Sequence, residues 1–155
     1  MRCTEWSTRL SIASSAPELV LKSLLAWLVV LCLAMANGAL REAVLIPLLG
    51  TPAGLILSGI LLSLLVALVA YGLLRIARGF TVMQGLLVGV LWLCLTLAFE
   101  FGFGRYVQHK SWAELLEAYT FKEGNIWPVV LVVTFLAPPL VSLIQGWSRN
   151  ARGRA

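Results

Sequence analysis

Long apolar segments separated by short polar stretches dominate the chain. They cover about residues 19–41, 52–76, 82–103 and 127–147. Each segment is long enough to cross a hydrocarbon core of about 30 Å, which takes about 20 residues of α-helix. Lipid favours helices because a helix satisfies its backbone polar groups within one segment. The pattern therefore predicts an all-α membrane protein built as a four-helix transmembrane bundle.

Polar tails flank these segments. Residues 1–18 are Ser-rich and residues 148–155 are basic, so we expect a transmembrane domain over residues 19–147. An alternative exists for the first apolar segment, because residues 34–36 (AMA) match the A-x-A cleavage site of a signal peptide. The region before that segment is long and contains acidic residues, which favours a retained span.

Prolines and glycines predict where the helices end or bend. Pro47 and Gly50 predict the end of the first helix, with residues 43–50 lying at the membrane interface. Pro52 suits the first turn of the second helix, where its missing N–H has no helical partner in any case. The adjacent prolines at 138–139 lie inside the fourth segment, and we expect them to break or kink it.

A short amphipathic helix is predicted between the third and fourth spans, over residues 111–120. Ser111 and Glu114 match the S-x-x-E capping box that begins many helices. Trp112 and Tyr119 follow on one side of this helix, together with two leucines. Two interpretations remain open: a lid over the mouth of the bundle, with Trp112 and Tyr119 as its contacts, or a passive anchor in the membrane interface.

The charged residues indicate a membrane and an orientation. The chain is 60% hydrophobic and 12% charged, whereas soluble domains are about 25% charged. Its net charge of +5 comes from residues spread over the ends of the spans, which argues against nucleic-acid binding and for contact with a lipid bilayer. Eight of the twelve Lys and Arg residues lie on the side of the two termini. We therefore expect a bacterial-type inner membrane protein with both termini in the cytoplasm.

Small residues mark helix faces suited to close packing. Gly59, Ser63 and Ala67 recur every four residues in the second span, and Gly85 and Gly89 form a GxxxG pair in the third. Such faces let helix backbones approach one another in lipid. We predict that they join copies of the chain, or join it to other membrane subunits.

A polar centre is predicted near the outer ends of the first and third spans. Residues 97–105 place Glu100 inside an apolar run, among three phenylalanines and before an arginine. Residues 33–41 contain Asn37 and share leucine, alanine, glycine and arginine with 97–105 at an offset of 64 positions. This offset suggests a parallel duplication of two-span halves. The glycines of the later segment leave open a local unwinding of its helix.

Helix rise places the polar residues of both spans at one depth. Asn37 and Glu100 each lie about 26 Å along their helices at about 1.5 Å per residue. Both helices are expected to run outward, so Arg41 could reach back towards Glu100. We predict that Arg41 and Glu100 form an ion pair completed by Asn37, and that Glu42 pairs with Arg105.

Two functions fit this polar centre. The first is a small transporter or channel-like protein in which Glu100 responds to an ion or substrate and Arg41 is its counter-charge. The second is a non-catalytic accessory or assembly subunit of a membrane complex, in which the cluster is structural. An enzyme is disfavoured because the chain has no aspartate and its single histidine is His109. No motif for a metal or cofactor occurs, and none is expected.

Overall fold

The structure, a computed structural model, describes residues 3–76 and 81–152, with the side chains of 17–76, 81–145 and 147. Within these residues the chain is helical, without strands, so the predicted all-α class is confirmed. Four of its helices are long and apolar enough to cross a membrane, as predicted. The element bounds are α1 Cys3–Leu40, η1 Arg41–Leu45, α2 Ile46–Leu49, α3 Thr51–Ile76, α4 Val82–Tyr106, α5 Trp112–Glu117, η2 Lys122–Gly124 and α6 Trp127–Arg152.

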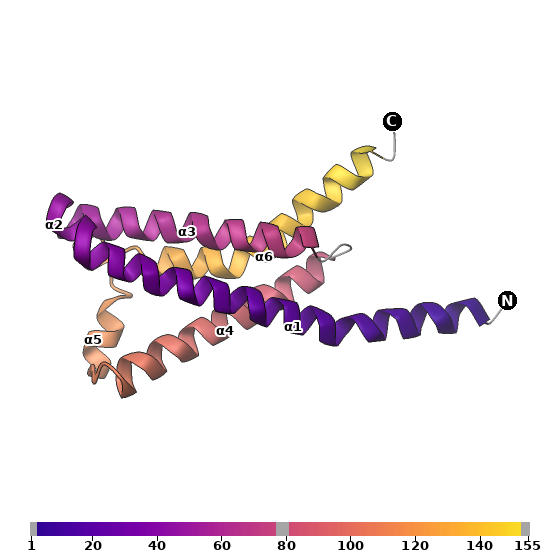
Figure 1. Cartoon of the computed structure of the whole chain (residues 1–155), viewed down its shortest axis with the longest axis horizontal. Coiled ribbons are helices and arrows are strands. Elements are labelled where there is room, and N and C mark those ends of the chain that lie inside the picture. Colours follow the sequence, from indigo (N-terminus) through magenta and orange to yellow (C-terminus); the bar gives the residue numbers. More distant parts are fainter. Residues whose placement is uncertain (1–2, 77–80, 153–155) are drawn as a thin grey trace.

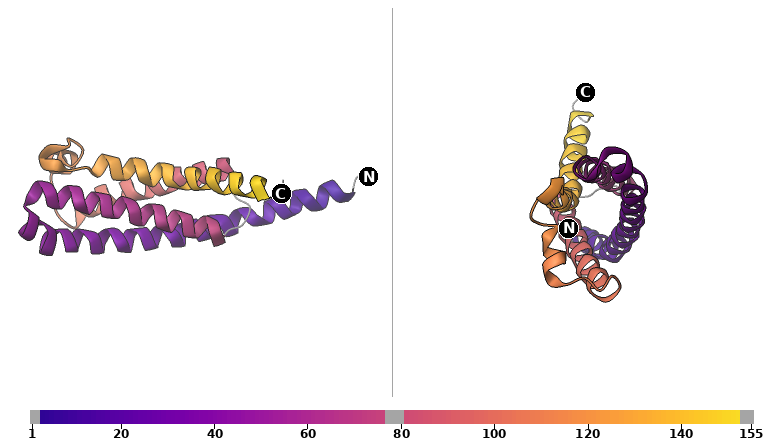
Figure 2. Two further views of the ribbon diagram at one scale, coloured as in Figure 1. Left: turned by 90° about the horizontal axis from the view of Figure 1, so that it is seen from above. Right: turned by 90° about the vertical axis from the view of Figure 1, so that its left-hand side faces the viewer.

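The four long helices form an elongated bundle (Figure 1). The beginning of α1 and the end of α6 lie at one end, and α2 and α5 lie at the other. Helix α1 has 38 residues, about 57 Å at 1.5 Å per residue, so it is longer than a hydrocarbon core. Figure 2 shows its N-terminal part extending beyond the other helices. This part includes residues that the sequence suggested as a polar tail.

The first helix ends through a widened turn that the sequence did not predict. After Leu40 the backbone passes through a π-helical turn, η1, in which the N–H of Ile46 donates to the carbonyl of Arg41. Gly50 then stops the helix at φ 81°, a left-handed conformation that favours glycine. This confirms the predicted end of the helix, and Pro52 lies in the first turn of α3 as expected.

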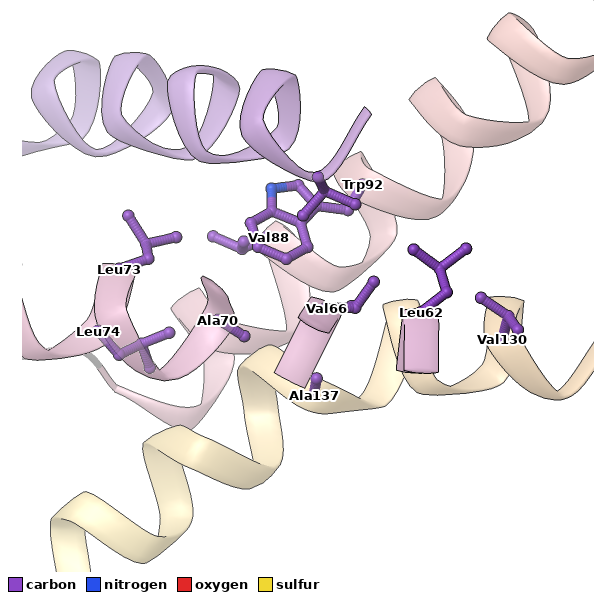
Figure 3. Close-up of a cluster of buried hydrophobic side chains, with 10 residues drawn as sticks. Leu62, Val66, Ala70, Leu73, Leu74, Val88, Trp92, Val130 and Ala137 are labelled. Atoms are coloured by element: carbon purple, nitrogen blue, oxygen red, sulfur yellow. The ribbon is translucent and has the colours of Figure 1, made fainter. Parts of the chain in front are cut away.

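The core lies along one face of α3. Its buried residues recur mostly every fourth position, which places them in one stripe along the helix. Helix α4 contributes Trp92, which is fully buried, and α6 contributes Val130 and Ala137 (Figure 3). The stripe on α3 consists of Gly54, Ser58, Leu62, Val66, Ala70 and Leu74.

Helix α6 bends at its paired prolines, so the predicted kink is confirmed. The helix remains continuous over Trp127–Arg152 but changes direction near its middle (Figures 1 and 3). Gly85 and Gly89 of α4 are buried against this bend. Gly59 of α3 is likewise next to Ile126, just before α6. These glycines therefore serve helix contacts within one chain, and self-association through the small-residue faces stays a prediction.

Candidate functional site

The Glu100 carboxylate joins three parts of the chain at the end of the bundle that carries α5. Glu100 lies in α4 and is half-buried. Its Oε2 atom accepts a hydrogen bond from the Tyr119 hydroxyl at 2.6 Å and another from the Trp127 indole Nε1 at 2.9 Å. Tyr119 follows α5, and Trp127 is the first residue of α6. We call these three residues the Glu100 cluster.

Local sequence signals bring Tyr119 to this cluster. The Ser111 hydroxyl accepts from the Glu114 N–H at 3.3 Å, and the Glu114 carboxylate accepts from the Ser111 N–H at 2.7 Å. This confirms the predicted capping box, which starts the short helix α5. Leu115 is buried against Gly104 of α4, where a Cβ would overlap its side chain. Helix α5 is thereby fixed across the end of α4, and Tyr119, two residues after the helix, donates to Glu100.

Two further aromatic rings, those of Phe101 and Trp112, pack beside Tyr119. The Phe101 ring stacks on the Tyr119 ring with centroids 6.0 Å apart and planes at 6°. The Trp112 ring is 6.1 Å from the same phenylalanine, although the Trp112 residue is 57% exposed. Both residues that the sequence suggested as a lid, Trp112 and Tyr119, therefore contact the helix that carries Glu100. Helix α4 is regular through this region and does not unwind at its glycines.

Tyr119 is held as a neutral donor. Burial raises the pKa of its hydroxyl well above its ordinary value, and the hydrogen bond to the Glu100 carboxylate raises it further. A phenol beside a carboxylate keeps its proton because ionisation would place two negative charges together. The proton of this hydrogen bond therefore comes from the tyrosine at physiological pH.

Asn37 lies in a separate polar contact. Its side-chain Nδ2 donates to the Ser58 carbonyl at 3.1 Å and to the Ser58 hydroxyl at 2.8 Å. Both residues are buried between α1 and α3. In the part of the chain that the structure describes, the Asn37 Oδ1 is buried without a partner. The expectation that Asn37 completes the hydrogen bonding of Glu100 is wrong.

The predicted ion pair between Arg41 and Glu100 is also wrong. Arg41 Nε lies 3.0 Å from Glu42 Oε1, so these sequence neighbours pair with each other in the η1 turn that follows α1. The predicted pair of Glu42 with Arg105 does not form, since Arg105 donates to the Lys110 carbonyl at 3.2 Å. The physical reason is helix direction: α1 and α4 diverge towards the end that carries Glu100 (Figure 1).

Trp127 is the residue of this site that the sequence did not single out. Trp127 was expected only as the start of the fourth span. A signal was nevertheless available, because a partly buried indole N–H needs an acceptor. Glu100 was the acidic residue expected near the outer end of its span, the end at which the fourth span begins. Which aromatic side chain reaches it depends on how α6 packs against α4.

Comparisons with protein-family models, with curated proteins and with solved structures found no match to this chain. Within the described residues, no three His, Cys, Asp or Glu side chains come together as metal ligands. The fold shows a multi-pass membrane protein, and the chemistry available at the Glu100 cluster is that of one carboxylate and two neutral aromatic donors.

Proposed function

We propose that the protein is a small membrane transporter in which Glu100 binds an ion or substrate and the connection above it acts as a gate. We call residues 107–126 the outer cap. The observation that supports this is the 2.6 Å hydrogen bond from Tyr119 of the cap to the Glu100 carboxylate. A lid residue thus rests directly on an acidic group inside a span.

Among the side chains that the structure describes, Glu100 has no basic partner at ion-pair distance. The ion pairs within 4.0 Å among the described residues are Lys22–Glu18, Arg41–Glu42 and Lys122–Glu117. A charge in a span costs about 2.5–3.5 kcal/mol on insertion scales, and such residues commonly mark ion and substrate paths. An unpaired carboxylate near the outer surface is suited to take up a proton or another cation.

The outer cap has the features of a segment that can move. Three of its non-glycine residues have a left-handed backbone, His109 at φ 56°, Phe121 at φ 55° and Glu123 at φ 54°. Each such conformation costs about 1 kcal/mol and persists only while surrounding contacts hold it. The hydrogen bond to Glu100 is one of those contacts. Its loss would favour release of the cap.

The proposed setting is a bacterial-type inner membrane with both termini in the cytoplasm. The bias of basic residues towards the side of the termini supports this orientation. The outer cap would then face the other side of the membrane. A substrate would meet the cap before it met Glu100.

Charge movement in reconstituted vesicles tests the proposal. Purified protein in liposomes loaded with a pH dye is given a membrane potential, and proton entry is followed. Glu100→Gln keeps an oxygen that accepts from Tyr119 and Trp127 but removes the charge. We expect Glu100→Gln to lose the flux without a change in melting temperature, while Glu42→Gln, an exposed acid, keeps it. Equal flux in Glu100→Gln and the unchanged protein would contradict the proposal.

An accessory subunit is the second candidate. It is favoured by the fact that both donors to Glu100 come from its own chain, which closes the cluster without any ligand. In that case Glu100→Gln would behave like the unchanged protein in every assay. Glu100→Ala, which leaves both donors unpaired, would lower the melting temperature.

A further inference from the structure

We infer that the Glu100 cluster binds a monovalent organic cation, of the ammonium or phosphonium type. The inference rests on the proposed function and names the substrate class for its site. It follows from three features: the charge of the carboxylate, the atom that both donors share, and the aromatic surroundings.

The charge comes first. With the cap closed, the Glu100 carboxylate accepts hydrogen bonds from two neutral donors, Tyr119 and Trp127. Tyr119 belongs to the outer cap, so opening the cap removes one of them. A carboxylate left in a span with fewer partners is strongly destabilised. A cation from the outer side would then take the place of the Tyr119 donor that the opened cap removes from Glu100.

Both hydrogen bonds go to one oxygen atom. Tyr119 and Trp127 each donate to Oε2 of Glu100. We take the ligand cation to occupy the position of the Tyr119 hydroxyl on this oxygen, where it displaces the tyrosine. Cation binding and the Tyr119 hydrogen bond then exclude each other at Oε2. The ligand therefore opens the outer cap by competing with Tyr119 for this oxygen.

The surroundings favour an organic cation over a metal ion. Calcium takes six to eight oxygen ligands and magnesium about six, but the oxygen-bearing side chains of this cluster are one carboxylate and one phenol. The remaining neighbours are aromatic: Tyr119 and Trp127 meet the carboxylate through their polar edges, and withdrawal of Tyr119 would uncover the Phe101 face on which its ring stacks. Aromatic faces attract weakly hydrated cations such as quaternary ammonium groups. A single carboxylate matches a single positive charge.

Equilibrium dialysis of the purified full chain in detergent tests this, with tetraphenylphosphonium and benzyltrimethylammonium as probes and triphenylphosphine oxide as the neutral control. We expect saturable binding of the cations that Glu100→Gln weakens at least about tenfold, as loss of a desolvated ion pair should, while Glu42→Gln leaves it unchanged. Tyr119→Phe removes the competing donor and should tighten binding severalfold. A purely structural Tyr119 would not give that gain.

Three results overturn the inference: no saturable binding, equal binding of the neutral control, or cation binding that Glu100→Gln leaves intact. If Glu100-dependent proton flux persists while no cation binds, the substrate class is wrong and the transporter proposal stands. If the cations bind through Glu100 but liposomes containing the protein take up neither protons nor benzyltrimethylammonium, the transporter proposal fails and the binding site stands.

Discussion

The carbonyl oxygen of Phe135 in α6 lies directly against Gly89 in α4, where a Cβ would overlap it. This carbonyl lacks its usual helical donor, because the residue four positions later is Pro139, which has no N–H. Glycine lets the two backbones meet at this point. The kink in α6 and the GxxxG pair in α4 are therefore two halves of one contact.

Gly89→Ala should destabilise the bundle. The added Cβ would force α4 and α6 apart, and overpacking of this kind costs about 1–3 kcal/mol. Thermal unfolding in detergent measures the loss. Gly102 lies in the same helix with open space around it, so Gly102→Ala should be neutral or slightly stabilising. Equal melting temperatures for the two variants would contradict this account of the contact.

Tyr119→Phe should loosen the outer cap without unfolding the spans. The variant loses a hydrogen bond to a charged group, worth about 1.5–3 kcal/mol. Hydrogen exchange measured by mass spectrometry should speed up in residues 111–120 and remain slow in the core of α3. Tyr106 is 80% exposed, so Tyr106→Phe is the matched control. Equal hydrogen-exchange rates in residues 111–120 of the two variants would refute the role of the Tyr119 hydrogen bond in holding the cap.

The start of α5 should weaken in acid. The backbone N–H of Ser111, followed by its hydroxyl, lowers the pKa of Glu114 below its ordinary value of 4.5. A carboxyl group whose pKa is lowered in the folded state stabilises that state at pH values above its ordinary pKa. This stabilisation is lost as the pH falls through the lowered pKa. Exchange at the first amides of α5 should therefore be slower in the unchanged protein than in Glu114→Ala at pH 7. This difference in exchange rate should vanish in strong acid. A difference that grows there would contradict a stabilising role of the capping box.

Trp92→Phe should destabilise the contact of α1 with α4. The Trp92 indole donates to the Ser23 carbonyl at 3.0 Å, and the Trp27 indole donates to the Thr96 hydroxyl at 3.2 Å. Trp92 is fully buried, so the smaller ring loses a hydrogen bond and leaves a cavity. Together these should lower the free energy of unfolding by about 1–3 kcal/mol. The melting temperature should fall. Trp147→Phe, at a residue that is 83% exposed, should leave it unchanged.

The sequence by itself determined the features that depend on neighbouring residues. Apolar length predicted four spans because lipid demands helices of that length. Ser111 and Glu114 predicted the start of α5, and Gly50 the end of the first helix, because caps and left-handed turns are satisfied within a few residues. Glu100 was also recognised as unusual from its apolar surroundings alone.

Only the tertiary structure decided which groups meet Glu100. Equal depth along two helices suggested Arg41, but depth does not give the distance between helices, and α1 diverges from α4 at that end (Figure 1). Instead, the packing of α6 against α4 and the path of the cap bring in Tyr119 and Trp127. Hydrogen-bond partners across 19 and 27 residues depend on helix crossing and loop path, which are set by packing of the whole bundle and not by local pattern.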